Sequence, residues 1–176
     1  QGAMCTWTLT STSSEIAIPY ISSYIFSLDF LIFDGKTLPR ALVQLLQDAL
    51  PKKAKVIRIH ASGDFFSEAY FNAFNQLAHN NRDVVFYAYT KQLQFVTASR
   101  PENFRMVYSI GGKDDKEFAK TTGVPYSKVI YNASQADAEI DDNDIHAYNG
   151  VSSNLIIHGT QPREINQKVK ALKELA

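Results

Sequence analysis

The chain has 176 residues, 45% of them hydrophobic and 20% charged, which is enough to build one globular domain with a sizeable core. Its 18 Lys and Arg balance 18 Asp and Glu, so the charge does not indicate a nucleic-acid partner held by nonspecific attraction to phosphate. The single cysteine, Cys5, excludes an intrachain disulfide framework and any zinc or iron–sulfur site built from several cysteines, and favours a cytoplasmic setting. No apolar stretch reaches the roughly 20 residues that a membrane span needs, so we expect no membrane partner.

Helical and strand patterns alternate along the chain. The opening residues 1–4, QGAM, look like a cloning remnant, and we expect one α/β domain over residues 5–176. Residues 4–10 are a candidate first strand, whereas 24–33 fits a strand or a helix equally well. Hydrophobic spacing then predicts helices at 41–50, 67–81, 91–99, 114–123 and from about 163, and strands at 55–60, 83–90, 104–110, 127–133 and 154–159.

Local signals mark some helix ends. Ser67 is placed to cap the helix at 67–81. Asp114 and Glu117 have the capping-box spacing, and Gly123 stands where helices stop, which predicts the helix at 114–123. The acidic run at 137–144 fails the calcium-loop template and is a candidate for a loop.

The alternation of strands and helices predicts right-handed β–α–β units and a mainly parallel sheet. The fold class is therefore α/β, and the sheet either forms part of a (β/α) barrel or stays open with flanking helices. In both arrangements, ligands bind at the carboxyl ends of the strands.

Polar residues follow the apolar part of each predicted strand, and these residues form the candidate site. The ligand-binding candidates are Ser62, Gly63, Tyr89, Lys91, Ser109 and Asn132, and the catalytic candidates are His60, Asp64 and His158. His60 or His158 would act as general acid or base, with Asp64 as the orienting carboxylate.

Each of these residues also has a purely structural interpretation. A histidine at a strand end is often a hydrogen-bonded structural residue, Asp64 could make a turn, and Lys91 could be solvated. Gly111 and Gly112 make either a plain turn or a site where backbone N–H groups approach an anion.

Four segments together resemble a poorly characterised family of phage and mobile-element proteins called gene product 88. The resemblance covers roughly residues 40–162, and the segments are RIHASGDFFSEAYFNAF, FYAYTK, RPENFRMVYSIGG and IIHGTQP. Members of that family usually carry an upstream cysteine cluster. In this they are similar to radical S-adenosylmethionine proteins, whose partial (β/α) barrel binds an iron–sulfur cluster. In those proteins a motif after the second strand holds the ligand's amino group, and residues 62–64, SGD, have a comparable place here.

This chain departs from that pattern because one cysteine cannot hold an iron–sulfur cluster. Either the redox chemistry was lost, or a segment between about Thr12 and Asp34 was removed, replaced or not recorded. S-adenosylmethionine remains a cofactor by analogy only.

The sequence thus predicts a phage or mobile-element protein in the host cytoplasm, whose polar strand-end pocket binds a nucleotide-like or S-adenosylmethionine-like small molecule without cluster-based radical chemistry. Whether it is an enzyme stays open. One alternative is a noncatalytic factor that binds a host protein through exposed aromatics in residues 20–33. A further alternative is a metal-dependent hydrolase built on His60, Asp64 and His158, since imidazole and carboxylate groups bind Zn, Fe or Mn. In the leading hypothesis, none of the candidate residues is a metal ligand.

Overall fold

The computed structural model describes residues 8–9, 16–17, 38–60, 63–141, 143–157 and 162–173. Its helices are α2 (Leu38–Ala49), α3 (Glu68–Asn80), α4 (Leu93–Thr97), α5 (Asp115–Phe118), α6 (Ile145–Asn149) and α7 (Arg163–Lys173), with one 3-10 helix, η1 (Ala133–Gln135). Its strands are β1 (Thr8–Leu9), β2 (Ile16–Ala17), β3 (Val56–Ile59), β4 (Val85–Thr90), β5 (Phe104–Ser109), β6 (Tyr126–Ile130), β7 (Ile140–Asp141) and β8 (Ser153–Ile156). The undecided segment at 24–33 lies outside the described residues.

The described chain separates into two compact units. The first unit contains the described residues up to Ala88 together with Ala98–Arg105, and the second contains Tyr89–Thr97 and the described residues from Met106 onward. Strands β4 and β5 each begin in the first unit and end in the second. The expectation of a single domain over residues 5–176 stays a prediction.

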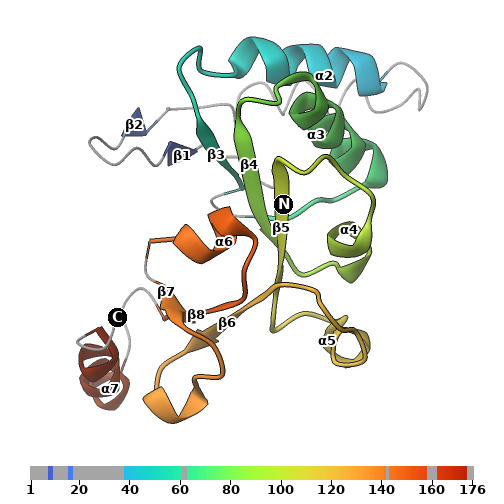
Figure 1. The fold of residues 1–176 in the computed structure, drawn as a ribbon. Helices are drawn as coiled ribbons and strands as arrows, with labels where there is room; N and C mark the ends of the chain where they lie inside the picture. Colours follow the sequence, from blue (N-terminus) through green and yellow to red (C-terminus); the bar gives the residue numbers. More distant parts are fainter. Residues whose placement is uncertain are drawn as a thin grey trace. The chain divides into compact units, whose positions relative to one another are not determined.

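In the first unit, β3 and β4 run parallel, with Val56 beside Val85 and Ile59 beside Ala88. The short strand β1 pairs antiparallel with both β2 and β3. Helices α2 and α3 pack against each other, as Figure 1 shows.

The core of the first unit forms between α3 and these strands. Helix α3 begins after Ser67, whose hydroxyl accepts a hydrogen bond from Tyr70 N at 3.2 Å, so the predicted cap is confirmed. Apolar residues recur on one face of the helix and are buried together with the inward side chains of β3 and β4. The largest fully buried side chains here are Ile57, Ile59, Phe65, Phe74, Leu77, Phe86 and Phe104.

In the second unit, the strands follow the order β5, β6, β8, β7 and all pair in parallel. Helix α7 packs against β8, and its Val169 is buried in a cluster with Ile130 and Ile156. The predicted start of this last helix at Arg163 is confirmed.

The predicted α/β class, with a mainly parallel sheet and flanking helices, is confirmed, because only the pairings of β1 are antiparallel within the two described units. Parallel strands need crossover connections, and α3 provides one between β3 and β4.

The prediction of a helix at 114–123 was wrong in its length, since α5 covers only Asp115–Phe118. The Asp114 side chain makes no cap; its carboxylate accepts instead from Leu93 N at 3.1 Å. The hydroxyl of Thr121 donates to the carbonyl of Phe118 at 2.7 Å, and such local side-chain bonds compete with helix continuation.

The expectation that 137–144 forms only a loop was also wrong, because this run contains β7, which pairs with β8. Two residues are too short a strand to produce a readable alternation of apolar and polar side chains. The pairing with β8 therefore depends on tertiary contacts rather than on the local pattern.

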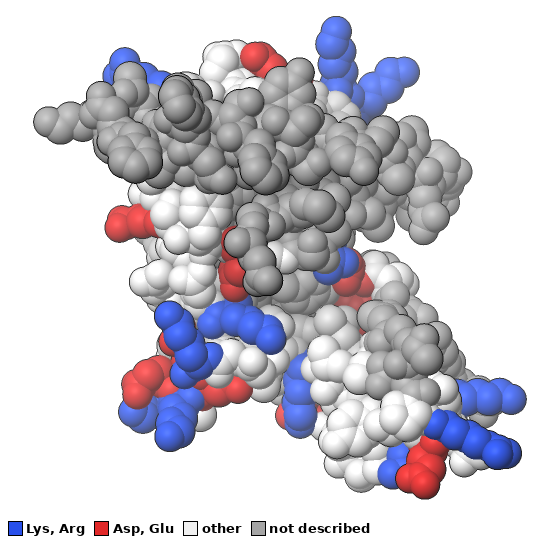
Figure 2. Space-filling view, turned by 180° about the vertical axis from the view of Figure 1, so that it is seen from behind, with Lys and Arg blue, Asp and Glu red and all other residues white. Residues whose placement is uncertain are grey.

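Charges of both signs are interspersed on the described part of the surface that Figure 2 shows, in keeping with the balanced composition. Within the described residues, no helix has the length and apolar character required to cross a membrane.

Candidate functional site

The predicted catalytic residue His60 lies directly after β3 in the first unit, and its side chain is enclosed by aromatic rings. Only 4% of the residue is exposed. Its ring lies edge-on to Phe65 at 4.6 Å and stacks with Tyr70 at 5.6 Å, measured between ring centroids. Its Nε2 lies 3.1 Å from the Tyr70 hydroxyl, and its backbone has a φ of 63°.

This apolar enclosure sets the charge of His60. Burial lowers the pKa of His60 to about 4, and the nearby Asp64 carboxylate offsets only part of that effect. The ring is therefore neutral at pH 7. A general acid or base role for His60 stays a prediction, and the contacts are those of a member of an aromatic cluster.

Asp64 makes a local contact beside this cluster. Its Oδ1 accepts a hydrogen bond from Phe65 N at 2.7 Å, and Gly63 before it has a φ of 90°. Such geometry fits the structural interpretation of a turn. The predicted partners Ser62 and His158 lie outside the described residues.

Two predicted ligand residues of the second unit have partners in that unit. Tyr89, near the end of β4, donates its hydroxyl hydrogen to Asp144 Oδ1 at 2.8 Å. Lys91 Nζ donates to the carbonyl of Gly111 at 3.2 Å. The ammonium group of Lys91 thus holds the turn after β5.

The glycines of that turn bind a carboxylate from the chain itself. The N–H groups of Gly111 and Gly112 donate to Asp115, as does the Tyr108 hydroxyl at 2.8 Å. Partial burial opposes ionisation of Asp115, but these hydrogen bonds outweigh it and lower the pKa of the carboxyl group. The backbone donors expected to approach an anion are therefore occupied by Asp115.

The structure does not bring the other two predicted ligand residues together. The strand register sets Ser109 beside Ser127, and Ser127 beside Ser153. Asn132 lies beyond the end of β6, where its Oδ1 accepts from Ser134 N at 3.3 Å and caps η1. Asn132 therefore has a local role that differs from that of Ser109.

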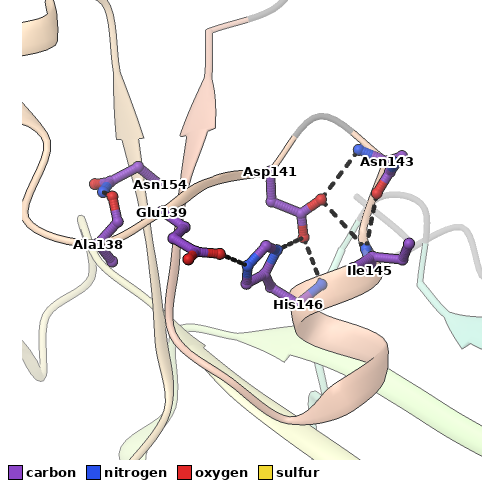
Figure 3. Close-up of polar contacts among 7 residues, drawn as sticks. All are labelled: Ala138, Glu139, Asp141, Asn143, Ile145, His146 and Asn154. Atoms are coloured by element: carbon purple, nitrogen blue, oxygen red, sulfur yellow. Dashed lines mark hydrogen bonds and ion pairs between the residues drawn. The ribbon is translucent and has the colours of Figure 1, made fainter. Parts of the chain in front are cut away.

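A group that the sequence interpretation missed occupies the end of β7 and the first turn of α6 (Figure 3). His146 Nε2 donates to Glu139 Oε2 at 2.8 Å, and its Nδ1 lies 3.2 Å from Asp141 Oδ2. The Nδ1 contact has the distance of an ion pair without hydrogen-bond geometry.

Asp141 is the fixed member of this group. It is 3% exposed, and its carboxylate accepts backbone N–H bonds from Asn143, Ile145 and His146 at 3.2, 3.2 and 2.7 Å. Asn154 of β8 holds the preceding segment, since its side chain donates to Ala138 O (Figure 3). These bonds orient a buried carboxylate toward an imidazole, which is the arrangement that positions a general acid or base.

The two carboxylates raise the pKa of His146. The hydrogen bond to Glu139 contributes most, burial acts against it, and the charge of Asp141 adds to the increase. His146 therefore holds its proton to a higher pH than an isolated histidine does.

We call Tyr89, Glu139, Asp141, Asp144 and His146 the strand-end cluster, because Tyr89 lies near the end of β4 and Asp141 at the end of β7. Tyr89 and Asp144 are included because they share a hydrogen bond and Asp144 directly precedes α6, the helix that carries His146. A usable signal existed in the sequence: an acidic run followed two residues later by a histidine. The sequence interpretation missed Asp141 because it took the strand that carries this residue for a loop.

Among the described residues, no group of three or more His, Cys, Asp or Glu side chains is arranged to hold a metal ion. Because His158 lies outside those residues, the metal-dependent alternative on His60, Asp64 and His158 stays a prediction.

Comparisons with known proteins identify relatives of this chain. A family model described as Gene product 88 matches residues 25–173. The Gene 88 protein of Mycobacterium phage L5 is 33% identical over 108 residues, which cover 58% of this chain and 45% of that protein. The match thus spans less than half of the phage protein. No solved structure matches the chain, and the similarity to radical S-adenosylmethionine proteins gains no support.

Proposed function

This chain belongs to the gene product 88 family, and we propose that it binds a small polar ligand at the strand-end cluster of its second unit. The ligand is a nucleotide-like or S-adenosylmethionine-like molecule, and the chain performs no radical chemistry that depends on an iron–sulfur cluster. The observation that carries the proposal is the buried Asp141 carboxylate, oriented by three backbone N–H groups toward His146. The reducing cytoplasm of the host is the proposed compartment, since the chain has one cysteine.

The charge of the cluster distinguishes between the two ligand classes. Glu139, Asp141 and Asp144 supply three carboxylates against the one imidazole of His146. Such a group attracts ammonium, sulfonium and hydroxyl donors and repels phosphate. S-adenosylmethionine carries a sulfonium, an ammonium group and ribose hydroxyls, and these two cations outweigh its one carboxylate. Its net charge is therefore positive, so it suits the cluster better than a phosphorylated nucleotide does.

His146 gives the site its reactive group. Its Nε2 faces Glu139, whose side chain is 83% exposed, so a ligand can approach this edge from solvent. With Nδ1 facing the buried Asp141, the imidazolium is stabilised, and His146 acts as a hydrogen-bond donor or general acid toward a bound ligand. A buried carboxylate behind the ring keeps its orientation fixed while Nε2 exchanges partners.

The binding test uses calorimetry on the full chain with S-adenosylmethionine, adenosine and AMP. We expect S-adenosylmethionine to bind more tightly than AMP, and Asp144→Asn and His146→Gln each to weaken that binding by about tenfold, the effect of one charged hydrogen bond. Glu117→Gln is the matched control: it removes an exposed carboxylate of the second unit that pairs with Lys120. Thermal melts show that each variant is folded.

The proposal is wrong if none of the three compounds binds at about 5 mM, the weakest affinity that a specific site of this kind would show. It is also wrong if Glu117→Gln weakens binding as much as His146→Gln does. A preference for AMP that is lost in Asp144→Asn or His146→Gln would contradict the charge argument and favour a phosphate-bearing ligand at this cluster.

Exposed apolar side chains favour a second candidate, a noncatalytic factor that binds a host protein. Val129 and Tyr131 alternate along and just beyond β6, so they share a face, and they are 49% and 40% exposed. Capture from host lysate with wild type and a Val129→Asp, Tyr131→Asp variant tests it. Under the ligand-binding proposal, this variant still binds S-adenosylmethionine. The aromatics at 20–33 that first suggested this alternative lie outside the described residues.

A further inference from the structure

A polar cavity in the first unit lies on the exposed face of α3. It is open to solvent and has a volume of about 530 Å³, within the range of small-molecule sites. One wall is a face of α3, on which Asn72, Gln76 and His79 succeed one another at helical spacing. The other wall is the segment that leads into β5, including Arg100.

The cavity has a positive lining. Arg82 and Arg100 contribute two guanidinium groups, and none of the side chains that line it is acidic. Arg105, in the same unit, adds to the positive charge near Arg100: burial lowers the pKa of Arg100, and the charge of Arg105 lowers it further. Arginine stays protonated despite such shifts, so the charge is permanent.

Both arginines are held in place by the backbone. Arg82 donates from Nε to His79 O at 3.1 Å and from Nη2 to His79 Nδ1 at 2.7 Å. The second bond makes Nδ1 an acceptor and places the ring proton on Nε2. Arg100 donates from Nε to Phe104 O at 2.9 Å and from Nη1 to Ala98 O at 3.0 Å. Guanidinium groups fixed in this way lose little conformational freedom when an anion binds.

Amide groups provide the remaining polar contacts. Asn75 donates from Nδ2 to Ser99 O at 3.0 Å, which joins the two walls, while its Oδ1 is enclosed and has no hydrogen-bond partner among the described residues. An enclosed acceptor without a partner is rare in folded proteins. Because this oxygen is enclosed, the amides that a ligand can reach are those of Asn72 and Gln76, whose side chains line the cavity and are exposed.

We propose that this cavity binds an oxyanion, phosphate or carboxylate, carried by a small molecule that also bears hydroxyl or amino groups. Planar guanidinium groups match the geometry of both oxyanions, and the neighbouring amides recognise polar groups of the remaining molecule. The acidic strand-end cluster favours the opposite charge, and the two sites are tested with variants at different residues, so each proposal can fail without the other.

The experiment is an NMR titration of the ¹⁵N-labelled full chain with inorganic phosphate, acetate, AMP and adenosine at about 50 mM salt, where screening of the cavity charge is modest. We expect saturable shifts of the backbone signals of Asn75, His79 and Arg82 with AMP and with at least one of the two simple anions. Adenosine, which has no oxyanion, leaves these signals unchanged. The comparison of phosphate with acetate identifies the oxyanion.

Variants at arginine supply the control. Arg82→Gln is expected to weaken AMP binding by about tenfold or more, and Arg82→Lys, which keeps the charge without the planar fork, by less. Arg40→Gln removes an exposed arginine from α2 of the same unit and leaves binding unchanged. The proposal is overturned if no anion gives saturable shifts at about 10 mM, or if Arg40→Gln and Arg82→Gln behave alike.

Discussion

The surroundings of His60 and of His146 differ in almost every respect, although each histidine follows a strand of a parallel pair. His60 follows β3 in the first unit and lies among Phe65, Tyr70 and other rings. His146 follows β7 in the second unit and lies between Glu139 and Asp141. Burial lowers the pKa of His60 to about 4, whereas the carboxylates raise the pKa of His146.

The groups that pack around each histidine set its chemistry. Rings exclude water and offer no counter-charge, so they favour the neutral imidazole. Carboxylates compensate the charge, so they favour the imidazolium and keep proton exchange available. In these two units, His60 stabilises an aromatic core and His146 is the better candidate for ligand chemistry.

The largest expected effect tests the aromatic core around His60. Phe65 is fully buried and touches the rings of His60, Phe71 and Phe74. We expect Phe65→Ala to lower the free energy of unfolding by about 3–5 kcal/mol, measured by urea denaturation at pH 7. The adjacent Phe66 is 56% exposed, so Phe66→Ala is the control and costs about 1 kcal/mol or less. Equal losses in the two variants would contradict this description of the core.

The next effect is a dependence of stability on pH. The folded state holds His60 with a pKa near 4, and the unfolded chain has the ordinary value of 6.5. Between these values the unfolded state binds more protons, so stability falls as pH decreases from 6.5 toward 4, by up to about 3 kcal/mol. Urea denaturation at pH 7 and pH 5 measures the change.

His60→Asn is the control for this pH effect, because asparagine tolerates the positive φ and does not titrate in this range. The variant is less stable at both pH values, but its loss between pH 7 and pH 5 is smaller than that of the wild type. An unchanged loss would assign the pH dependence to other groups.

A smaller effect of opposite sign is expected at His146. Its raised pKa stabilises the folded state fully below the unfolded value of 6.5, and this stabilisation is lost as pH rises through the folded pKa. Glu139→Gln and Asp141→Asn each lower the pKa of His146 in an NMR titration. Only Asp141→Asn also costs about 1–3 kcal/mol of stability, since Asp141 is buried and accepts three backbone bonds. A His146 pKa that is unchanged in both variants would refute the cluster.

The smallest effect concerns Tyr89. Tyr89→Phe removes the hydrogen bond to Asp144 and should cost about 1 kcal/mol in urea denaturation. Tyr131→Phe, at an exposed tyrosine of the same unit, serves as control with a change near zero. A loss at Tyr131 as large as that at Tyr89 would show that the Asp144 contact contributes nothing specific.

Long, strongly patterned segments were predictable from the sequence. Helix α3 follows from its apolar spacing and from Ser67, whose capping bond forms as expected. Strands β4 and β5 follow from runs of β-branched and aromatic residues. Helix α3 is predictable because burial of one face imposes a helical period on the sequence. Strands β4 and β5 have consecutive buried residues, and burial of both faces gives continuous apolar runs.

The candidate site was predictable only in its location at strand ends. That Tyr89 faces a ligand stays a prediction, and its hydrogen bond to Asp144 could not be read from the sequence. Asp141 and His146 were missed because β7 is two residues long and pairs with a strand that follows it in the chain. No local pattern encodes such a pairing.

The sequence by itself determined the α/β class, the principal helices and strands, and the absence of any multi-cysteine metal site, because composition and periodicity are properties of the chain alone. Only the tertiary structure decided which histidine is sealed among rings and which is held between carboxylates. Those surroundings come from residues brought together by folding, as when Tyr89 reaches Asp144, and pKa values depend on that proximity.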